Sequence, residues 1–182
     1  MGRWSRQQAD TMLSELARIG KIRRLTRGLY DYPEYSPFLK SELAPNMEQV
    51  AGAFARKFNW RIVASGETAL NLIGLSTQIP ARYVFLSDGP ARSYDILGTR
   101  LEFRKTTLKD IGFKHKESAL IVQALKALGK EQITGEVIEQ IRNWIKPSHR
   151  PRILRDAKGT TDWIYEAMKS ICGESGGQDR TA

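Results

Sequence analysis

The sequence predicts an α+β fold, in which a small N-terminal unit precedes a mixed domain of short strands and several helices. A helical pattern at the start of the chain is followed by a basic hairpin pattern, and a proline-rich stretch separates both from the rest. The 182 residues are 41% hydrophobic and 27% charged, a composition that supports a buried core. We expect the N-terminal unit over residues 1–36, the mixed domain over 46–172 and a disordered tail over 173–182.

Residues 5–19 are expected to form an amphipathic helix. Ser5 and Gln8 have the spacing of a capping box, and Gly20 suits the left-handed conformation that ends many helices. Apolar side chains recur at helical spacing and form one stripe: Ala9, Met12, Leu13, Leu16 and Ala17.

A compact β-hairpin is predicted over residues 21–32, with Gly28 in its turn and Pro33 after its second strand. A helix followed by a basic two-stranded ribbon is typical of the second half of a winged helix-turn-helix. The two helices that normally precede the recognition helix are missing from this sequence. We therefore expect a partial winged helix at the N-terminus.

The remaining elements follow a loop-like segment over residues 33–45, which contains three prolines. Helices are predicted over 47–58, 67–73, 117–129, 134–146, 149–158 and 161–172. Strands are predicted over 60–64, 83–86, 93–97 and 101–104.

Positive charge is concentrated near the N-terminus. The chain carries net +9, and its first thirty residues hold seven basic side chains against two acidic ones. Cations along a ribbon can contact phosphates, and short polar side chains on a helix can meet base edges in the major groove. The predicted DNA-binding residues are Arg3, Ser5, Arg6, Gln7, Thr11, Ser14, Arg18, Lys21, Arg23, Arg24, Thr26, Arg27 and Tyr30. The alternative is a solvated helix followed by an ordinary basic hairpin.

No catalytic, metal or cofactor site is predicted, so we expect a protein that is not an enzyme and binds no cofactor. His115 and His149 are the only histidines, and neither has a carboxylate at a metal-ligand spacing. Cys172, the only cysteine, is expected to be a buried thiol. The absence of a disulfide pair, a signal-peptide core and a membrane-spanning run predicts a cytoplasmic protein without membrane contact.

Three segments resemble the AbiEi family of antitoxins. Residues 20–33 (GKIRRLTRGLYDYP) resemble its wing, and residues 65–80 (SGETALNLIGLSTQIP) and 85–92 (FLSDGPAR) resemble its later motifs. The similarity runs from about residue 4 to the helices near residue 170. The resemblance implies a type IV toxin–antitoxin role in abortive infection by phage. In such proteins a winged helix represses the operon, and a C-terminal domain counters a nucleotidyltransferase-like toxin without a stable complex.

These observations together predict an antitoxin that is also an autorepressor. It would bind double-stranded DNA at its own promoter, and a homodimer on an inverted repeat is one arrangement for this binding. A stand-alone transcriptional regulator is one alternative. A second is a protein-interaction module that has lost DNA binding and docks a partner on its N-terminal apolar stripe. A third is a small enzyme acting on nucleic acid, which would require carboxylates or histidines with shifted pKa values in one pocket.

Overall fold

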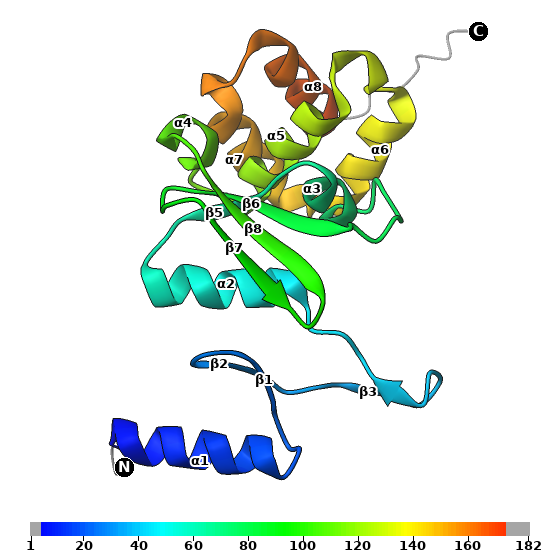
Figure 1. Cartoon of the computed structure of the whole chain (residues 1–182). Helices are drawn as coiled ribbons and strands as arrows, with labels where there is room; N and C mark the ends of the chain where they lie inside the picture. The colour runs from blue at the N-terminus through cyan, green and yellow to red at the C-terminus, as the bar shows by residue number, and fades with distance from the viewer. Residues whose placement is uncertain (1–4, 174–182) are drawn as a thin grey trace, which may run out of the picture.

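The computed structural model describes residues 5–173 and has the predicted α+β fold (Figure 1). The helices are α1 Arg6–Arg18, α2 Met47–Phe58, α3 Glu67–Leu72, α4 Leu108–Ile111, α5 Lys116–Leu128, α6 Gly135–Trp144, α7 Arg150–Asp156 and α8 Asp162–Cys172. The strands are β1 Arg23–Thr26, β2 Leu29–Asp31, β3 Tyr35–Ser36, β4 Ser41–Glu42, β5 Ile62–Ala64, β6 Arg82–Ser87, β7 Arg92–Ile96 and β8 Thr99–Lys105. Short 3-10 turns, Lys130–Gln132, Pro147–His149 and Ala157–Gly159, join the last helices.

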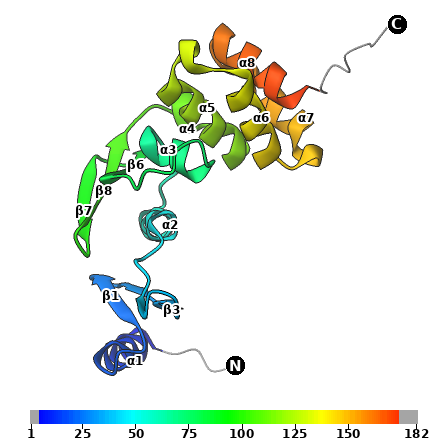
Figure 2. The same ribbon diagram turned by 90° about the vertical axis from the view of Figure 1, so that its right-hand side faces the viewer.

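A four-stranded sheet in the order β5-β6-β8-β7 forms the centre of the larger part. Strands β6 and β8 are parallel, with Phe85 opposite Phe103, whereas β5 and β7 run antiparallel to their neighbours. Helices α5 to α8 gather on one side of the molecule, and α2 lies between them and the N-terminal hairpin in both views (Figures 1 and 2). None of the helices among the described residues is both long and apolar enough to cross a bilayer.

Aromatic packing holds α2 on the sheet. Phe54 of α2 is 2% exposed, stacks on Tyr94 with ring centroids 4.2 Å apart and meets the edge of Phe103 at 5.8 Å. One turn later, Phe58 stacks on Trp60 at 4.7 Å. Such pairs add about 0.5–1.5 kcal/mol each to the gain from burying their area, so the position of α2 is strongly fixed.

The N-terminal helix and hairpin have the predicted form. The capping box is present: Gln8 N donates to Ser5 Oγ at 3.2 Å, and Ser5 N donates to Gln8 Oε1 at 2.8 Å. The hairpin packs on the main core through Leu25, which is 9% exposed, and through the half-buried Leu29. Helix α1, in contrast, buries none of its residues. Among the described residues, the apolar stripe is therefore only partly covered: Met12 is 45% exposed and its other members are half-buried.

The expectation of a loop over residues 33–45 is wrong in part. Strands β3 and β4 form a short antiparallel ladder, in which Tyr35 is opposite Glu42 and Ser36 is opposite Ser41. Prolines lack the amide hydrogen that a ladder needs, and here they lie beside the two-residue strands without interrupting them. Helix α4 was not predicted. The proposed disorder of the tail lies outside the described residues beyond Gly173.

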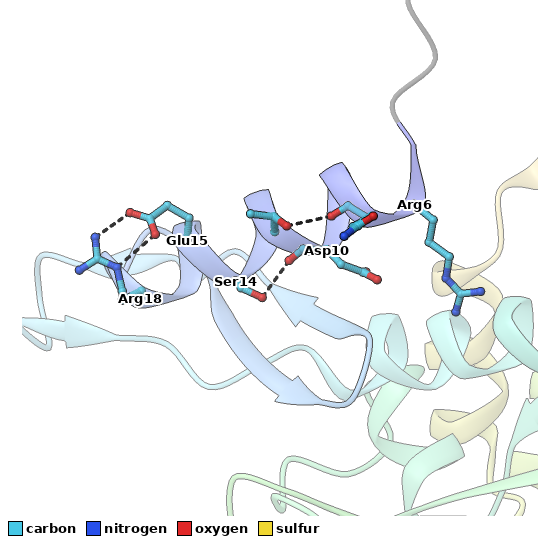
Figure 3. A pocket seen from close by; sticks show the side chains of 7 residues that line it. Arg6, Asp10, Ser14, Glu15 and Arg18 are labelled. Atoms are coloured by element: carbon cyan, nitrogen blue, oxygen red, sulfur yellow. Dashed lines mark hydrogen bonds and ion pairs between the residues drawn. The ribbon is translucent and has the colours of Figure 1, made fainter.

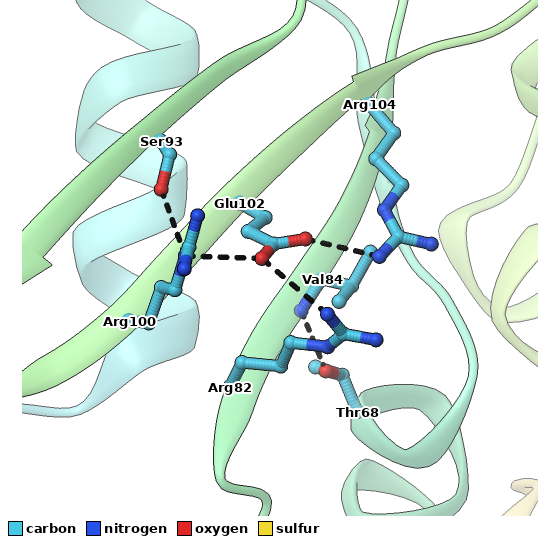
Figure 4. Close-up of polar contacts among 7 residues, drawn as sticks. All are labelled: Thr68, Arg82, Val84, Ser93, Arg100, Glu102 and Arg104. Carbon is cyan, nitrogen blue, oxygen red and sulfur yellow. Dashed lines mark hydrogen bonds and ion pairs between the residues drawn. The ribbon is translucent and has the colours of Figure 1, made fainter.

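A second group of basic residues lies on the sheet and is partly neutralised there (Figure 4). Glu102 of β8 has a side chain only 13% exposed and is surrounded by arginines. Its carboxylate contacts Arg104 at 3.0 Å, Arg100 at 3.1 Å and Arg82 at 3.7 Å. The hydrogen bond from Arg104 outweighs burial and lowers the pKa of Glu102 below its ordinary value. Arg82, Arg100 and Arg104 therefore pair with a carboxylate of the protein itself.

Candidate nucleic-acid interface

A cavity of about 550 Å³ lies between α1, the β1–β2 hairpin and α2. Four of the side chains that line it are cationic: Arg6 from α1, Arg24 and Arg27 from the hairpin, and Lys57 from α2. Asp10 is the acidic residue of the lining, and Ser14 and Tyr30 are among its polar members. We call this cavity the cationic cleft.

The arginines of the cationic cleft are not neutralised by the protein. Within residues 5–173, the side chains of Arg6, Arg24 and Arg27 form no ion pair or hydrogen bond, and all three are exposed. Lys57 Nζ donates to the carbonyl oxygen of Arg27 at 3.0 Å and so ties the hairpin turn to α2. Gly28 in that turn has φ +72°, a conformation that favours glycine. Cations gathered in this way without counterions favour a polyanionic ligand.

The polar face of α1 also forms an open groove, in which all lining residues belong to that helix (Figure 3). Gln7, Thr11 and Arg18 line only this groove, whereas Arg6 and Ser14 line both the groove and the cleft. Thr11 donates its hydroxyl to the carbonyl oxygen of Gln7 at 2.9 Å. Its oxygen still has lone pairs that can accept a hydrogen bond.

Two other side chains of this groove bond within α1. The Ser14 hydroxyl donates to the carbonyl oxygen of Asp10 at 2.8 Å, and Arg18 pairs with Glu15 at 2.6 Å. The hydrogen bond from Arg18 lowers the pKa of Glu15 below its ordinary value. Because both side chains of this ion pair are exposed, it can exchange for a contact with phosphate.

Arg23 is predicted to bind DNA, but its side chain is held by partners within the protein. Its guanidinium lies 2.5 Å from Asp31 and 3.6 Å from Glu42, and it donates to the carbonyl oxygen of Leu43 at 3.0 Å. The side chain is only 21% exposed. The hairpin register places Arg23 directly opposite Asp31, so the guanidinium joins β1, β2 and the segment after β4. The charge of Arg23 is therefore already paired within the protein, unlike that of Arg24 in the same strand.

The other predicted residues are placed as follows. Ser5 caps α1, Thr26 is half-buried in β1, Tyr30 lines the cleft, Lys21 is exposed outside it, and Arg3 lies outside the described residues. Sequence reasoning missed Lys57. The sequence signal for a basic site here was the Arg56-Lys57 pair in the last turn of α2. Basic residues are common in that turn because they interact favourably with the helix dipole, so the pair did not stand out.

Comparison with known proteins finds one family for this chain. Residues 5–153 match a family of unknown function, DUF6088. The chain belongs to the DUF6088 family. Its matched region begins beside α1 and ends within α7, so it includes the whole cationic cleft of this DUF6088 protein. No curated protein and no solved structure matches the chain.

The DUF6088 protein has one further cluster that sequence spacing did not reveal. His149 Nδ1 lies 3.1 Å from Glu117 Oε1, and Arg152 contacts the same oxygen at 3.1 Å. No group of three or more histidine, cysteine, aspartate or glutamate side chains could hold a metal within the described part of the chain. Cys172 is half-buried rather than fully buried, and burial raises the pKa of its thiol.

The contrast between Arg23 and Arg24 gives a testable prediction. Arg23→Ala leaves Asp31 without its partner and should lower the free energy of unfolding by about 1–3 kcal/mol. Arg24→Ala removes an exposed side chain and should change it by less than about 0.5 kcal/mol. Urea titration followed by circular dichroism measures both values. Equal values for the two variants would show that Arg23 has no structural role.

Proposed function

We propose that this DUF6088 protein binds double-stranded DNA through α1 and the cationic cleft. The observation that carries the proposal is the convergence of Arg6, Arg24, Arg27 and Lys57, which come from three separate segments and line one cavity with a single carboxylate. A duplex presents phosphates at regular spacing, and each cation that contacts one releases condensed counterions. Several such contacts at one place give a higher affinity for DNA than isolated surface cations do.

The proposed binding mode uses α1 as a recognition helix and the hairpin as a wing. The major groove of B-DNA is about 12 Å wide and admits an α-helix. Because α1 buries none of its residues, it can enter such a groove. Gln7, Thr11 and Ser14 would then meet base edges, and Arg24 and Arg27 would contact the flanking phosphates.

The resemblance to AbiEi antitoxins supports a more specific proposal. The DNA would be the protein's own promoter, bound in the cytoplasm by a homodimer on an inverted repeat. The C-terminal domain would counter a nucleotidyltransferase-like toxin of the same operon without a stable complex. The motifs at residues 65–80 and 85–92 that carry this resemblance form α3 with its flanking loops, and the end of β6.

A protein-interaction module is the second candidate, and the exposure of the α1 stripe favours it. Met12 of the stripe is 45% exposed, and Ile19, just beyond the end of α1, is 52% exposed. Contiguous exposed apolar surface marks docking sites in many proteins. This candidate differs from the first because it requires the stripe of α1 and does not require the cations of the cleft.

DNA binding can be measured by fluorescence anisotropy with a labelled fragment of the upstream region and a scrambled fragment of equal length. We expect preference for the native fragment and an affinity that falls steeply with salt. Arg24→Glu/Arg27→Glu should weaken binding at least about tenfold on both fragments, because phosphate contacts are lost. Gln7→Ala should instead reduce the preference between fragments, because a base contact is lost.

The matched control is Lys130→Glu/Lys146→Glu, which makes the same change in net charge at two exposed positions near the C-terminal helices. It should retain binding close to that of the wild type. If the control and the cleft variant weaken binding equally, the effect comes from net charge and the cleft is not the binding site.

The antitoxin role predicts that expression of the chain rescues growth of cells producing the toxin encoded beside it. Since the C-terminal domain would carry this activity, Arg24→Glu/Arg27→Glu should rescue growth as well as the wild type while no longer repressing a promoter fusion. Colony counts and reporter activity measure the two effects. Failure of the wild-type chain to rescue growth would contradict the antitoxin role and leave the proposal of DNA binding intact.

A further inference from the structure

We infer that a second cavity, between α2, β5 and the start of α5, binds a small amphipathic anion: an apolar body that carries one anionic head group. This cavity has a volume of about 530 Å³, within the range of about 300–1,000 Å³ that is usual for small-molecule sites. We call it the apolar pocket. It is separate from the cationic cleft, and the inference does not depend on the proposed DNA binding.

The floor of the apolar pocket is hydrophobic. Val63 and Ala64 of β5, Phe85 of β6 and Ala119 of α5 line it and are buried, and the half-buried Phe113 lies beside them. A ligand with an apolar body would remove the remaining exposed part of this surface from water. Each Å² of apolar area buried in this way contributes about 25 cal/mol.

The rim of the apolar pocket is cationic. Arg56, Arg61, Lys114 and Lys116 contribute to the lining and are exposed, and Glu48 is its acidic residue. Over the described residues, none of these four cationic side chains forms an ion pair or a side-chain hydrogen bond. A negatively charged head group would supply the missing partner.

The geometry of the rim is fixed by Asp156 at the end of α7. Its carboxylate accepts hydrogen bonds from the backbone amides of Lys114 at 3.0 Å and His115 at 2.9 Å. Burial raises the pKa of Asp156, but its favourable contacts, these two bonds among them, together outweigh burial and hold the pKa below its ordinary value. The ionised carboxylate therefore holds the backbone of two lining residues in place.

The wall of the pocket is similarly fixed at Trp60. Its ring packs on Gly89 so closely that a Cβ added there would lie 2.3 Å from the ring, and glycine is required at that position. A preformed pocket binds a small ligand without the entropic cost of ordering its walls.

The combination of floor and rim identifies the class of ligand. A polyphosphate chain would satisfy the rim cations but would leave the apolar floor in contact with water. An uncharged apolar molecule would cover the floor but gain no attraction from the rim cations, which would stay hydrated. An amphipathic anion satisfies both, and carboxylate and phosphate head groups share this chemistry.

The test uses three probes and the full chain. The probes are 8-anilinonaphthalene-1-sulfonate, which is apolar and anionic, N-phenyl-1-naphthylamine, which is apolar and uncharged, and sulfate, which has no apolar body. By fluorescence titration we expect saturable binding of the first probe to one site and much weaker binding of the second. Sulfate, which is not fluorescent, should displace the first probe only weakly. Arg61→Glu/Lys114→Glu should lower the affinity for the first probe at least about tenfold, whereas the control Lys130→Glu/Lys146→Glu should leave it unchanged. Displacement by decanoate and by decyl phosphate then distinguishes the two head groups.

Three results would overturn the inference. The first is equal affinity for the anionic and uncharged probes, because the rim would then contribute nothing. The second is unchanged binding in Arg61→Glu/Lys114→Glu. The third is loss of probe binding in Met12→Ser, which would place the probe on the exposed stripe of α1. All three are measured without DNA, so they are independent of the result for the cationic cleft.

Discussion

The contact between Phe54 and the rings of Tyr94 and Phe103 fixes α2 on the sheet, and both cavities depend on where α2 lies. One side of α2 lines the cationic cleft through Phe54 and Lys57, and another lines the apolar pocket through Ala55 and Arg56. A rotation of α2 would change both cavities at once. The rings of Phe54, Tyr94 and Phe103 therefore determine the shape of both cavities as well as forming part of the core.

The second constraint is electrostatic, and it concerns which cations the protein neutralises. Arg23 is held by Asp31 and Glu42, and three arginines of the sheet share Glu102. Asp31 is 22% exposed and Glu102 is 13% exposed, so these pairs satisfy largely buried carboxylates and also occupy the arginines that contact them. Arg6, Arg24 and Arg27 have no such partner and meet at one cavity. Net charge alone does not separate these two groups of arginines.

Local sequence signals predicted much of the fold correctly. Ser5 and Gln8 mark the start of α1, and Gly20, with φ +72°, lies just beyond its end. These signals act within a few residues, so one sequence is enough to find them. The ladder of β3 and β4 was missed because its strands are two residues long and lie among prolines, where the local pattern resembles a loop.

The candidate site was predicted only in part, because some of its contacts join residues far apart in sequence. Lys57 reaches Arg27 across thirty positions, and Arg23 reaches the carbonyl oxygen of Leu43 across twenty. Composition identified the basic N-terminus, but pairing in three dimensions determines which cations remain available. The apolar pocket shows the same dependence, since β5, α2 and the start of α5 meet there only after folding.

The most direct measurement of the central claim is the salt dependence of DNA binding by Lys57→Gln. Lys57 lies on α2, outside the helix and hairpin, and glutamine keeps a donor for the carbonyl oxygen of Arg27 while removing the charge. If the cationic cleft holds the DNA backbone, the slope of log K against log salt should fall by about 1, with no change in preference between fragments. An unchanged slope would show that α2 does not contact the backbone and would contradict the cleft as the binding site.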